Sequence, residues 1–550
     1  MSLPSLLRSA LLALSISSAL AKEPLMLLDM VYPNPGEGPT HSRFLDPAFL
    51  KSWGYTGNVP REFVQCAVTY GKFDPDLLPP DSPDLKWIQQ NAASAEKTFT
   101  AMTAAGIPCY PFTDFIVVPK LLKEKYQSEI CDEKGRIDIH RPKTREIIVA
   151  MIDEIFTRFP QLAGITLRHG ETYLHDTPFH TGGNPILQGE ESHVKLLEIL
   201  REEICVKRNK VLFYRTWDFG NMHDRPDYYL AVTGRIEPHK NLVFSIKHQR
   251  GDFHRLSIFN PCLGIGKHRQ VVEVQCQLEA YGKGAFPYYN GQGVIDGWEE
   301  YVGHSGPKGL RDLLPNPLFA GVWTWSRGGG WKGPYIPHEF WIEMNTYVIS
   351  SWTRTPERSE EEIFDEFATR IAGIEDPADR RRLREIALLS AKAVLHSQNS
   401  LVHKLDVWWN RDHYFSDISK ELHHLAAEGK TEAFLKEKAE ASAQWRQIES
   451  LSRELTVPDA ATLEYIRVSS TYGRIKAEII EQMCRASLYA HHASPADPRV
   501  KEALASYDAR WEEWRKLLKD HPESCPTLYT DKAFGEGPGM GAAMMKLRQP

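Results

Sequence analysis

The sequence lacks the features that several large classes of protein require. It has no cluster of basic residues, and its formal net charge is −6. Neutralising nucleic-acid phosphates needs clustered Lys and Arg, so we expect no nucleic-acid partner. Beyond the N-terminus no stretch supplies the ~20 apolar residues of a membrane span, so we expect none. No G-x-G-x-x-G follows the first expected strand, which argues against a dinucleotide site.

Metal-ligand patterns are also missing. The eight cysteines are scattered and form no C-x-x-C pair, so a zinc ribbon is not expected. Those inside apolar runs, such as Cys276, are expected to be buried thiols, while disulfide pairing stays open. His169, His175, His180 and His193 show no H-E-x-x-H or paired ligand spacing. We therefore expect hydrogen-bonding or solvated imidazoles and no metal.

The N-terminus has the three parts of a secretory signal peptide. Arg8 precedes an apolar run over residues 10–20, and Ala19 and Ala21 form an A-x-A cleavage pattern. We expect a signal peptide over residues 1–21 and a secreted or periplasmic mature protein. A frayed apolar N-terminal helix is the alternative interpretation.

The first half of the chain alternates short apolar runs with longer amphipathic stretches. The composition is globular, with 42% hydrophobic and 25% charged residues. Helices are expected at 82–105, 144–159 and 192–207. Strands are expected at 24–30, 63–70, 107–115, 163–168, 211–217, 242–247, 271–276 and 320–326. Eight strands with intervening helices predict an α/β fold, a (β/α)₈ TIM barrel over residues 22–352. An open doubly wound sheet is the alternative.

The second half changes character after residue 352. Glu, Ala, Leu, Arg and Lys recur at helical spacing, without an exact repeat or a sustained heptad. We expect an all-α C-terminal domain over residues 353–531, with helices at 376–405, 431–455, 460–488 and 497–519. A homodimer through this domain stays open. Residues 532–550 are Gly-rich at their start and are expected to be a loop-like tail.

Charged and aromatic side chains gather just past the expected strands. In such barrels the active residues lie at the carboxyl ends of strands. Carboxylates on separate strands fit glycoside hydrolysis, in which one acid protonates the leaving oxygen and another carboxylate activates water. Cations beside them suggest an anionic substrate, and Trp faces suit a sugar ring. These residues are Arg168, Glu171, Arg215, Trp217, Lys247, Asp252, Glu273, Glu279 and Trp325.

The stretch from 241 to 279 carries a resemblance to a known family. Lys247 ends an apolar run, Asp252 and Phe253 follow, and Glu273-x-Gln275 leads to Glu279. This spacing resembles the central signature of the α-glucuronidases, family 67 of the glycoside hydrolases. The segment from Trp341 to Trp352 and the acidic helix start after it are similar to that family too. The family's N-terminal β-sandwich has no counterpart before the first expected strand.

The resemblance implies an activity, a set of roles and a substrate. Glu171 would be the general acid, and Asp252 with Glu279 would activate water in an inverting mechanism. Arg215 and Lys247 would bind the uronate carboxylate. It implies no cofactor. The substrate would be an α-linked, sometimes 4-O-methylated, glucuronic acid on an acidic oligosaccharide or polysaccharide, released by an exo-acting enzyme.

Structural alternatives accompany each of these roles. Glu171 could be a surface-loop residue, Asp252 a helix N-cap, and Glu279 the acidic first turn of a helix. Arg215 and Lys247 could form a structural ion-pair network, with Glu273 as a partner of either one. At the level of the whole chain, the alternatives are a glycosidase for another acidic or branched glycan and a non-catalytic glycan-binding protein.

Overall fold

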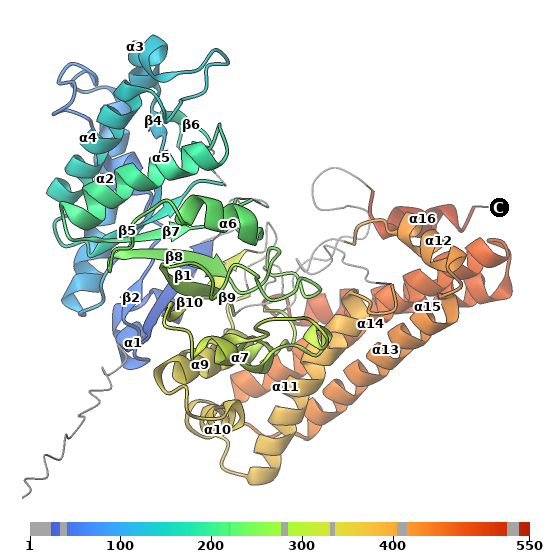
Figure 1. The fold of residues 1–550 in the computed structure, drawn as a ribbon. Helices are drawn as coiled ribbons and strands as arrows, with labels where there is room; N and C mark the ends of the chain where they lie inside the picture. Colours follow the sequence, from blue (N-terminus) through green and yellow to red (C-terminus); the bar gives the residue numbers. More distant parts are fainter. Residues whose placement is uncertain are drawn as a thin grey trace, which may run out of the picture.

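The centre of the molecule is an eight-stranded sheet with parallel pairings throughout (Figure 1). This computed structural model describes residues 24–33, 41–170, 172, 174, 177–218, 221–276, 284–329, 336–403, 415–524 and 538–549. The strand order is β2-β1-β10-β9-β8-β7-β5-β3. The strands are β1 (Met26–Pro33), β2 (Gly57–Asn58), β3 (Phe112–Asp114), β5 (Gly164–Arg168), β7 (Val211–Arg215), β8 (Leu242–Lys247), β9 (Arg269–Gln275) and β10 (Phe319–Gly329).

Backbone hydrogen bonds at Asn58 join the two ends of this strand order. The Asn58 N–H donates to Pro108 O at 2.9 Å, and the Tyr110 N–H donates to Asn58 O at 2.9 Å. These bonds connect β2 to the segment that leads into β3, so the sheet closes on itself. The expected (β/α)₈ barrel is confirmed, and the open doubly wound sheet is wrong.

Helices cover the outside of the barrel (Figure 1). The expected N-cap of the 82–105 helix is present, since the Ser82 hydroxyl accepts the Leu85 N–H. The helices are α1 (Pro47–Ser52), α2 (Pro83–Ala104), α3 (Lys120–Ile130), α4 (Pro142–Arg158), α5 (Glu190–Leu200), α6 (Pro226–Thr233), α7 (Gly291–Asp296), α8 (Leu310–Leu313) and α9 (Phe340–Arg354). A π-helical turn, Arg201–Val206, continues α5. The short strands β4 (Val117–Pro119) and β6 (His180–Gly182) pair antiparallel outside the barrel.

The C-terminal half is helical, as expected, and lies beside the barrel (Figure 1). A capping box at Ser359 and Glu362 starts its first helix. Its helices are α10 (Glu360–Glu366), α11 (Pro377–Gln398), α12 (Ser419–Ala427), α13 (Thr431–Glu454), α14 (Ala460–His492), α15 (Pro498–Asp520) and α16 (Met540–Lys546). Helix α13 packs against both α11 and α14, and α14 also packs against α15. The expected boundary at residue 352 falls inside the last turn of α9.

Two sequence expectations differ from the structure. The segment 63–70 is not a strand: residues Val64–Ala67 form a buried 3₁₀ turn, and the two-residue β2 takes the second place in the barrel. The tail is not entirely loop, because α16 buries Met540 and Met544. Residues 1–21 lie outside the described part, so the signal peptide stays a prediction.

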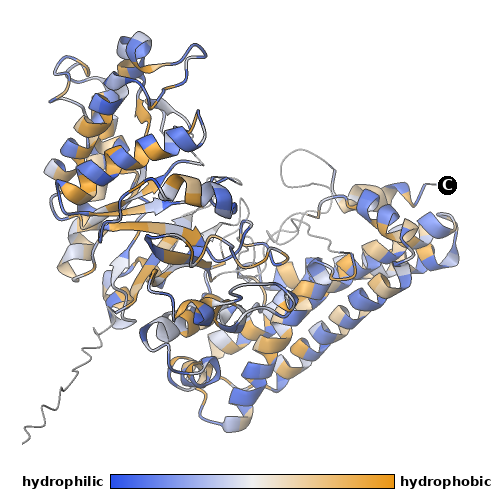
Figure 2. Cartoon of the chain, viewed as in Figure 1, coloured by the Kyte–Doolittle hydropathy of each residue, from blue (hydrophilic) through white to orange (hydrophobic). Residues whose placement is uncertain are grey.

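The barrel interior changes from apolar to charged along several strands. Interior side chains run from Phe213 to Arg215 on β7, and from Val243 through Ser245 to Lys247 on β8. The apolar interior side chains pack into one cluster, which extends to Tyr32, Phe253 and Trp325 near the carboxyl ends of the strands. Figure 2 shows the hydrophobic strands inside and mixed helices outside. The carboxyl end of the barrel is therefore where charge gathers.

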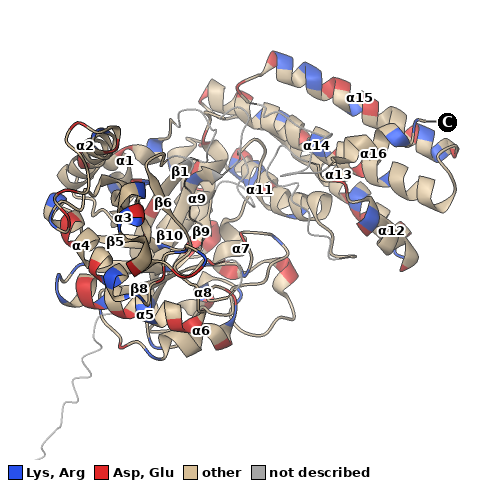
Figure 3. Cartoon of the chain, turned by 90° about the horizontal axis from the view of Figure 1, so that it is seen from above, with Lys and Arg blue, Asp and Glu red and all other residues tan. Residues whose placement is uncertain are grey.

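Cysteine and membrane features can be checked only over the described residues. The seven cysteines there are free and buried, which confirms the expectation of buried thiols. Within the same part of the chain, no helix has the length and apolarity needed to cross a membrane. Figure 3 shows both signs of charge interspersed over the outer helices of the barrel and along α15.

Candidate active site

Three strands of the barrel end in a buried cation that contacts a carboxylate of the chain. Arg168, Arg215 and Lys247 are the last residues of β5, β7 and β8. Each is at most 2% exposed. A buried charge needs a partner of opposite sign, and the structure provides one for each.

Arg168 is held at the first of these strand ends by Asp114, the last residue of β3. Its Nε donates to Asp114 Oδ1 at 2.8 Å and its Nη2 to Oδ2 at 2.6 Å. This is the bidentate geometry that a guanidinium prefers. The Nη1 group donates to Tyr32 Oη at 2.8 Å, and the guanidinium lies 4.7 Å from the centre of the Phe63 ring. Arg168 is therefore fixed by β1 and β3 together.

Arg215 contacts Glu273, which lies inside β9. The Nε group of Arg215 lies 3.0 and 3.1 Å from the two carboxylate oxygens, and Ser245 Oγ donates to Oε1 at 2.7 Å. Glu273 is fully buried. The sequence left either Arg215 or Lys247 as its partner, and in the structure it contacts Arg215. The guanidinium also lies 5.1 Å from the centre of the Trp325 ring. Three neighbouring strands thus meet in one ionic contact.

Lys247 contacts Asp252, five residues later in the chain. The lysine side chain is 1% exposed and the aspartate side chain 12%. The ammonium lies 3.6 Å from the centre of the Trp217 ring, 4.8 Å from Phe253 and 5.8 Å from Trp325. An ammonium over aromatic faces is stabilised by the ring quadrupoles. Asp252 is therefore the more solvent-accessible end of a charged pair with aromatic walls.

The backbone after Lys247 turns sharply to bring Asp252 back. No helix begins at Asp252, so the N-cap alternative is wrong. Phe253 has φ of 58°, in the left-handed region that non-glycine residues rarely adopt. Its ring returns to the barrel, 5.8 Å from Trp325 and 5.6 Å from His248. Strained backbone of this kind is found at functional sites and needs firm packing around it.

The tryptophans that we expected at the rim are mostly buried. Trp217 is 7% exposed and Trp325 is 6% exposed, while Trp323 is fully buried. Trp323 belongs to the apolar interior cluster and lies 6.2 Å from Trp325. Trp217 and Trp325 both flank the Lys247 ammonium, so in this structure they enclose the Lys247–Asp252 pair.

Two expected site residues, Glu171 and Glu279, lie outside the described residues. The residue before Glu171 is constrained by a close backbone approach. A Cβ added at Gly170 would lie 2.4 Å from Trp217 O and 2.6 Å from the Cα of Asp218. Only glycine fits there without a backbone shift, so the chain leaves β5 tightly against the end of β7.

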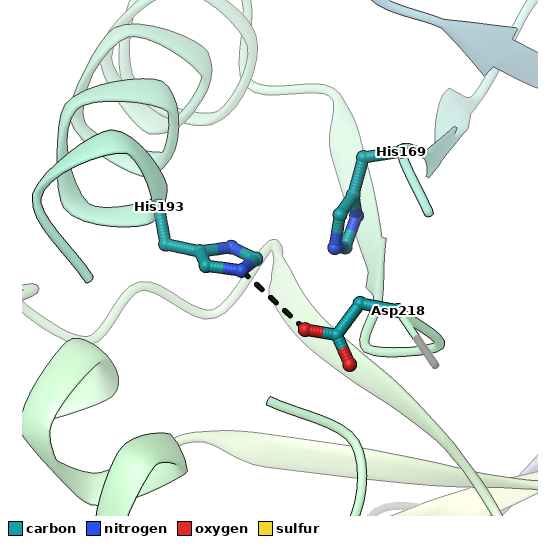
Figure 4. A group of neighbouring side chains, drawn as sticks. All are labelled: His169, His193 and Asp218. Atoms are coloured by element: carbon teal, nitrogen blue, oxygen red, sulfur yellow. Dashed lines mark ion pairs between the residues drawn. The ribbon is translucent and has the colours of Figure 1, made fainter. Parts of the chain in front are cut away.

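Sequence analysis missed a second cluster on the outer side of the same strand ends. His169 follows β5, Asp218 lies just past β7, and His193 comes from α5 (Figure 4). We call these three residues the His–Asp cluster. His169, His180 and His193 are buried rather than solvated, while His175 lies outside the described residues. In the sequence, the only indication of this cluster was that His169 and Asp218 each follow the end of an expected strand.

The His–Asp cluster holds a neutral imidazole beside a charged carboxylate. Burial, assisted by His193, lowers the pKa of His169 to about 3. Burial acts to raise the pKa of Asp218, but contacts with His193 and His169 and backbone N–H groups, including that of Met222, lower it to about 2. At neutral pH Asp218 is therefore ionised and His169 is uncharged.

Comparisons with known proteins show similarity of fold. No protein-family model matches the sequence, and no curated protein matches it significantly. A GH138 enzyme targeting pectin rhamnogalacturonan II aligns over 96% of this chain and 68% of its own, with 12% identity and a TM-score of 0.53. An O-GlcNAc hydrolase of Thermobaculum terrenum aligns over 96% and 93%, with 8% identity and a TM-score of 0.42. At this identity the alignment with the GH138 enzyme shows a shared fold alone.

Proposed function

We propose that this chain is a glycoside hydrolase whose reaction takes place at the carboxyl ends of β5, β7, β8 and β9. The observation that carries the proposal is the Asp252–Lys247 pair. It places a partly exposed carboxylate among aromatic side chains at the end of the barrel where such enzymes act. The fold similarity to the GH138 enzyme, which targets a polysaccharide, supports a glycan substrate.

Asp252 is the proposed base in this reaction. Lys247 balances its charge and fixes its direction, so the carboxylate is held in position to accept a proton from water. A non-catalytic glycan-binding protein would need aromatic surfaces but has no use for a buried lysine that orients an aspartate. The aromatic walls keep the pair partly shielded from solvent, which strengthens electrostatic interactions there.

Glu171 is the proposed acid, and Glu279 the proposed second acidic residue at the base. Glu171 follows Gly170 directly, and Gly170 packs on the backbone at the end of β7. Asp252 follows β8, so acid and base would come from different strands of the barrel. The resemblance to family 67 supports inversion at the anomeric carbon, in which the base activates a water molecule between the two acids.

An acidic sugar, α-linked glucuronic acid first among them, is the proposed substrate. Arg215 and Lys247 were expected to bind its carboxylate, and both already contact carboxylates of the chain. A substrate carboxylate would therefore share a cation with Glu273 or Asp252. The resemblance to family 67 supports the uronide, and another acidic or branched glycan fits the same residues. Export through residues 1–21 is part of this proposal.

A released-sugar screen on acidic oligosaccharides tests the proposed activity. We expect hydrolysis by the wild-type chain and a ~10²–10⁴-fold lower turnover for Glu171→Gln, the usual contribution of a general acid. Glu191→Gln serves as the control, because Glu191 is exposed and pairs with Arg235 on the outer surface. Binding of the oligosaccharides without release of sugar would favour a glycan-binding protein instead.

Substrate charge is tested with a matched pair of glycosides. The wild-type enzyme should prefer a uronide to the same sugar reduced at C6, by ~10-fold or more in kcat/KM, as expected for a charged hydrogen bond. A preference for the neutral sugar would reject the uronide and leave the glycosidase proposal intact.

A further inference from the structure

We propose that the His–Asp cluster of His169, His193 and Asp218 is a binding site for a divalent transition metal of the zinc type. The three residues come from three separate elements and meet in the buried layer between the barrel wall and α5 (Figure 4). This site is independent of the proposed hydrolase activity.

The potential donor atoms already lie close together. One atom from each residue lies within 4.8 Å of the others, and His193 Nε2 lies 3.6 Å from Asp218 Oδ2. A tetrahedral ion with bonds of ~2.0–2.1 Å separates its donors by about 3.3 Å. The two imidazole rings are nearly perpendicular, with centroids 4.9 Å apart, so they approach a common point from different directions.

Ring nitrogens of the cluster lack hydrogen-bond partners among the described residues. Both ring nitrogens of His169 and Nε2 of His193 are buried without one, and Nε2 of His193 has only its 3.6 Å contact with Asp218. His169 is 1% exposed and His193 is fully buried. A buried polar atom without a partner destabilises the fold, so an inward nitrogen on each of two neighbouring rings indicates a bound species. A metal ion would satisfy the inward nitrogen of each ring.

The surroundings hold two of the ligands in position. Tyr214 Oη lies 2.8 Å from His193 Nδ1, which turns Nε2 toward the cluster. The Asp218 carboxylate accepts backbone N–H groups of Met222 at 2.8 Å and Asn221 at 3.1 Å. Ligands in metal sites are oriented by outer contacts of this kind.

The donor set points to the class of metal. Two imidazole nitrogens and one carboxylate oxygen suit Zn²⁺ and its first-row neighbours better than Mg²⁺ or Ca²⁺, which prefer oxygen alone. The second oxygen of Asp218 or a water would complete the coordination. Because all three ligands are buried, the ion would be structural. It would tie the ends of β5 and β7 to α5, one residue away from Arg168 and Trp217.

Metal analysis of the purified full-length chain tests this proposal. After expression with added Zn²⁺ and gel filtration, we expect one metal ion per chain by mass spectrometry. His169→Gln and Asp218→Asn should lose it. His180→Gln is the matched control, since His180 is also a buried histidine but lies on β6, outside the cluster, and this variant should keep the metal.

A second measurement covers variants that fail to fold. Wild-type chain stripped with a chelator should melt at a lower temperature and recover on addition of Zn²⁺. Replacement by Co²⁺ should give the visible absorption of a low-symmetry nitrogen–oxygen site. If the wild-type chain contains no metal and its melting temperature does not change on addition of Zn²⁺, the metal site is wrong and the cluster holds only a buried water. Equal metal content in wild type and all three variants would also overturn the site.

Discussion

Lys247 shows how much a single side chain depends on its partners in this barrel. Its ammonium is almost fully buried, and it is stabilised by Asp252 and by the ring of Trp217. Removing one member of a buried pair leaves the other charge uncompensated, which is costlier than removing both. The pair should therefore behave as a unit in mutagenesis.

A double-mutant cycle tests that coupling. Asp252→Asn leaves the Lys247 charge buried and should destabilise the fold by about 3–5 kcal/mol. The double variant with Lys247→Met should recover a large part of that loss, since an apolar chain suits the aromatic walls. Lys240→Met, at the exposed residue just before β8, is the control for charge alone. Denaturant unfolding would give the four free energies, and simple additivity would contradict the coupling.

Gly170 lies beside the candidate site and leaves no room for an added methyl group. Gly170→Ala would place a Cβ against two backbone atoms of the β7 end, which cannot move aside as a side chain can. We expect a lower melting temperature and a ~10-fold or larger fall in turnover, because displacements of ~1 Å at a site are costly. Gly135→Ala is the comparison variant, because Gly135 has positive φ but open space around an added Cβ, and it should keep full turnover. Full turnover in Gly170→Ala would contradict the requirement for glycine beside the site.

Sequence reasoning located residues near the site wherever local pattern and strand position agreed. Arg215, Lys247 and Glu273 stood out because charges at the ends of apolar strands need partners. Glu273 was expected as a partner of Arg215 or Lys247, but the partner of Arg168 was not predicted. It is Asp114 on the neighbouring strand β3, and that strand pairing is set by the fold. The His–Asp cluster was not predicted, because His193 lies on a helix and its approach to His169 depends on tertiary packing.

At the scale of elements, long helices and most apolar strands were predicted well, whereas the second strand of the barrel was not. Strand β8 and helices α2, α13 and α15 lie within a few residues of their expected bounds. The two-residue β2 carries no periodicity, so it could not be recognised. The run 63–70 resembles a strand because it is mostly apolar. Its residues Val64–Ala67 are instead buried as a 3₁₀ turn, where Gln65 Oε1 accepts the Asp114 N–H. Tertiary burial overrode the local pattern there.

Helices α10 and α11 are joined by an ion pair that also contacts the barrel. Glu360 is 3% exposed; it pairs with Arg384 of α11 and accepts the hydroxyl of Tyr289, which precedes α7. Glu360→Ala would leave a half-buried guanidinium without this partner, so we expect a loss of about 3 kcal/mol in unfolding free energy. Glu361→Ala, at an exposed neighbour, should change stability little. Equal melting temperatures for the two variants would show that the pair contributes nothing.

At the scale of the whole molecule, polar contacts connect the barrel and the helical half. Arg255, which follows β8, donates to Ala391 O of α11 at 2.8 Å. His396 of α11 lies 3.3 Å from Glu299 of the barrel and 2.9 Å from Glu437 of α13. Burial alone would lower the pKa of His396, but the two carboxylates raise it to about 8.

This histidine predicts a pH-dependent stability. Because its folded pKa is above the unfolded value, its contribution is fully present below pH 6.5 and is lost as pH rises through about 8. After allowance for partial exposure, the effect is on the order of 1 kcal/mol. His396→Gln should melt lower than wild type at pH 6 and nearly equally at pH 9. A constant difference across that range would contradict the assignment.

The stereochemistry of the released sugar tests the central claim most directly, because it depends on an acid and a base from different strands of one barrel. Proton NMR of the first minutes of hydrolysis, before mutarotation, reports the anomer that forms first. With an α-linked uronide, the proposed roles of Glu171 and Asp252 predict the β-anomer. Early appearance of the α-anomer, or a covalent sugar adduct on Glu171, Asp252 or Glu279, would contradict the account.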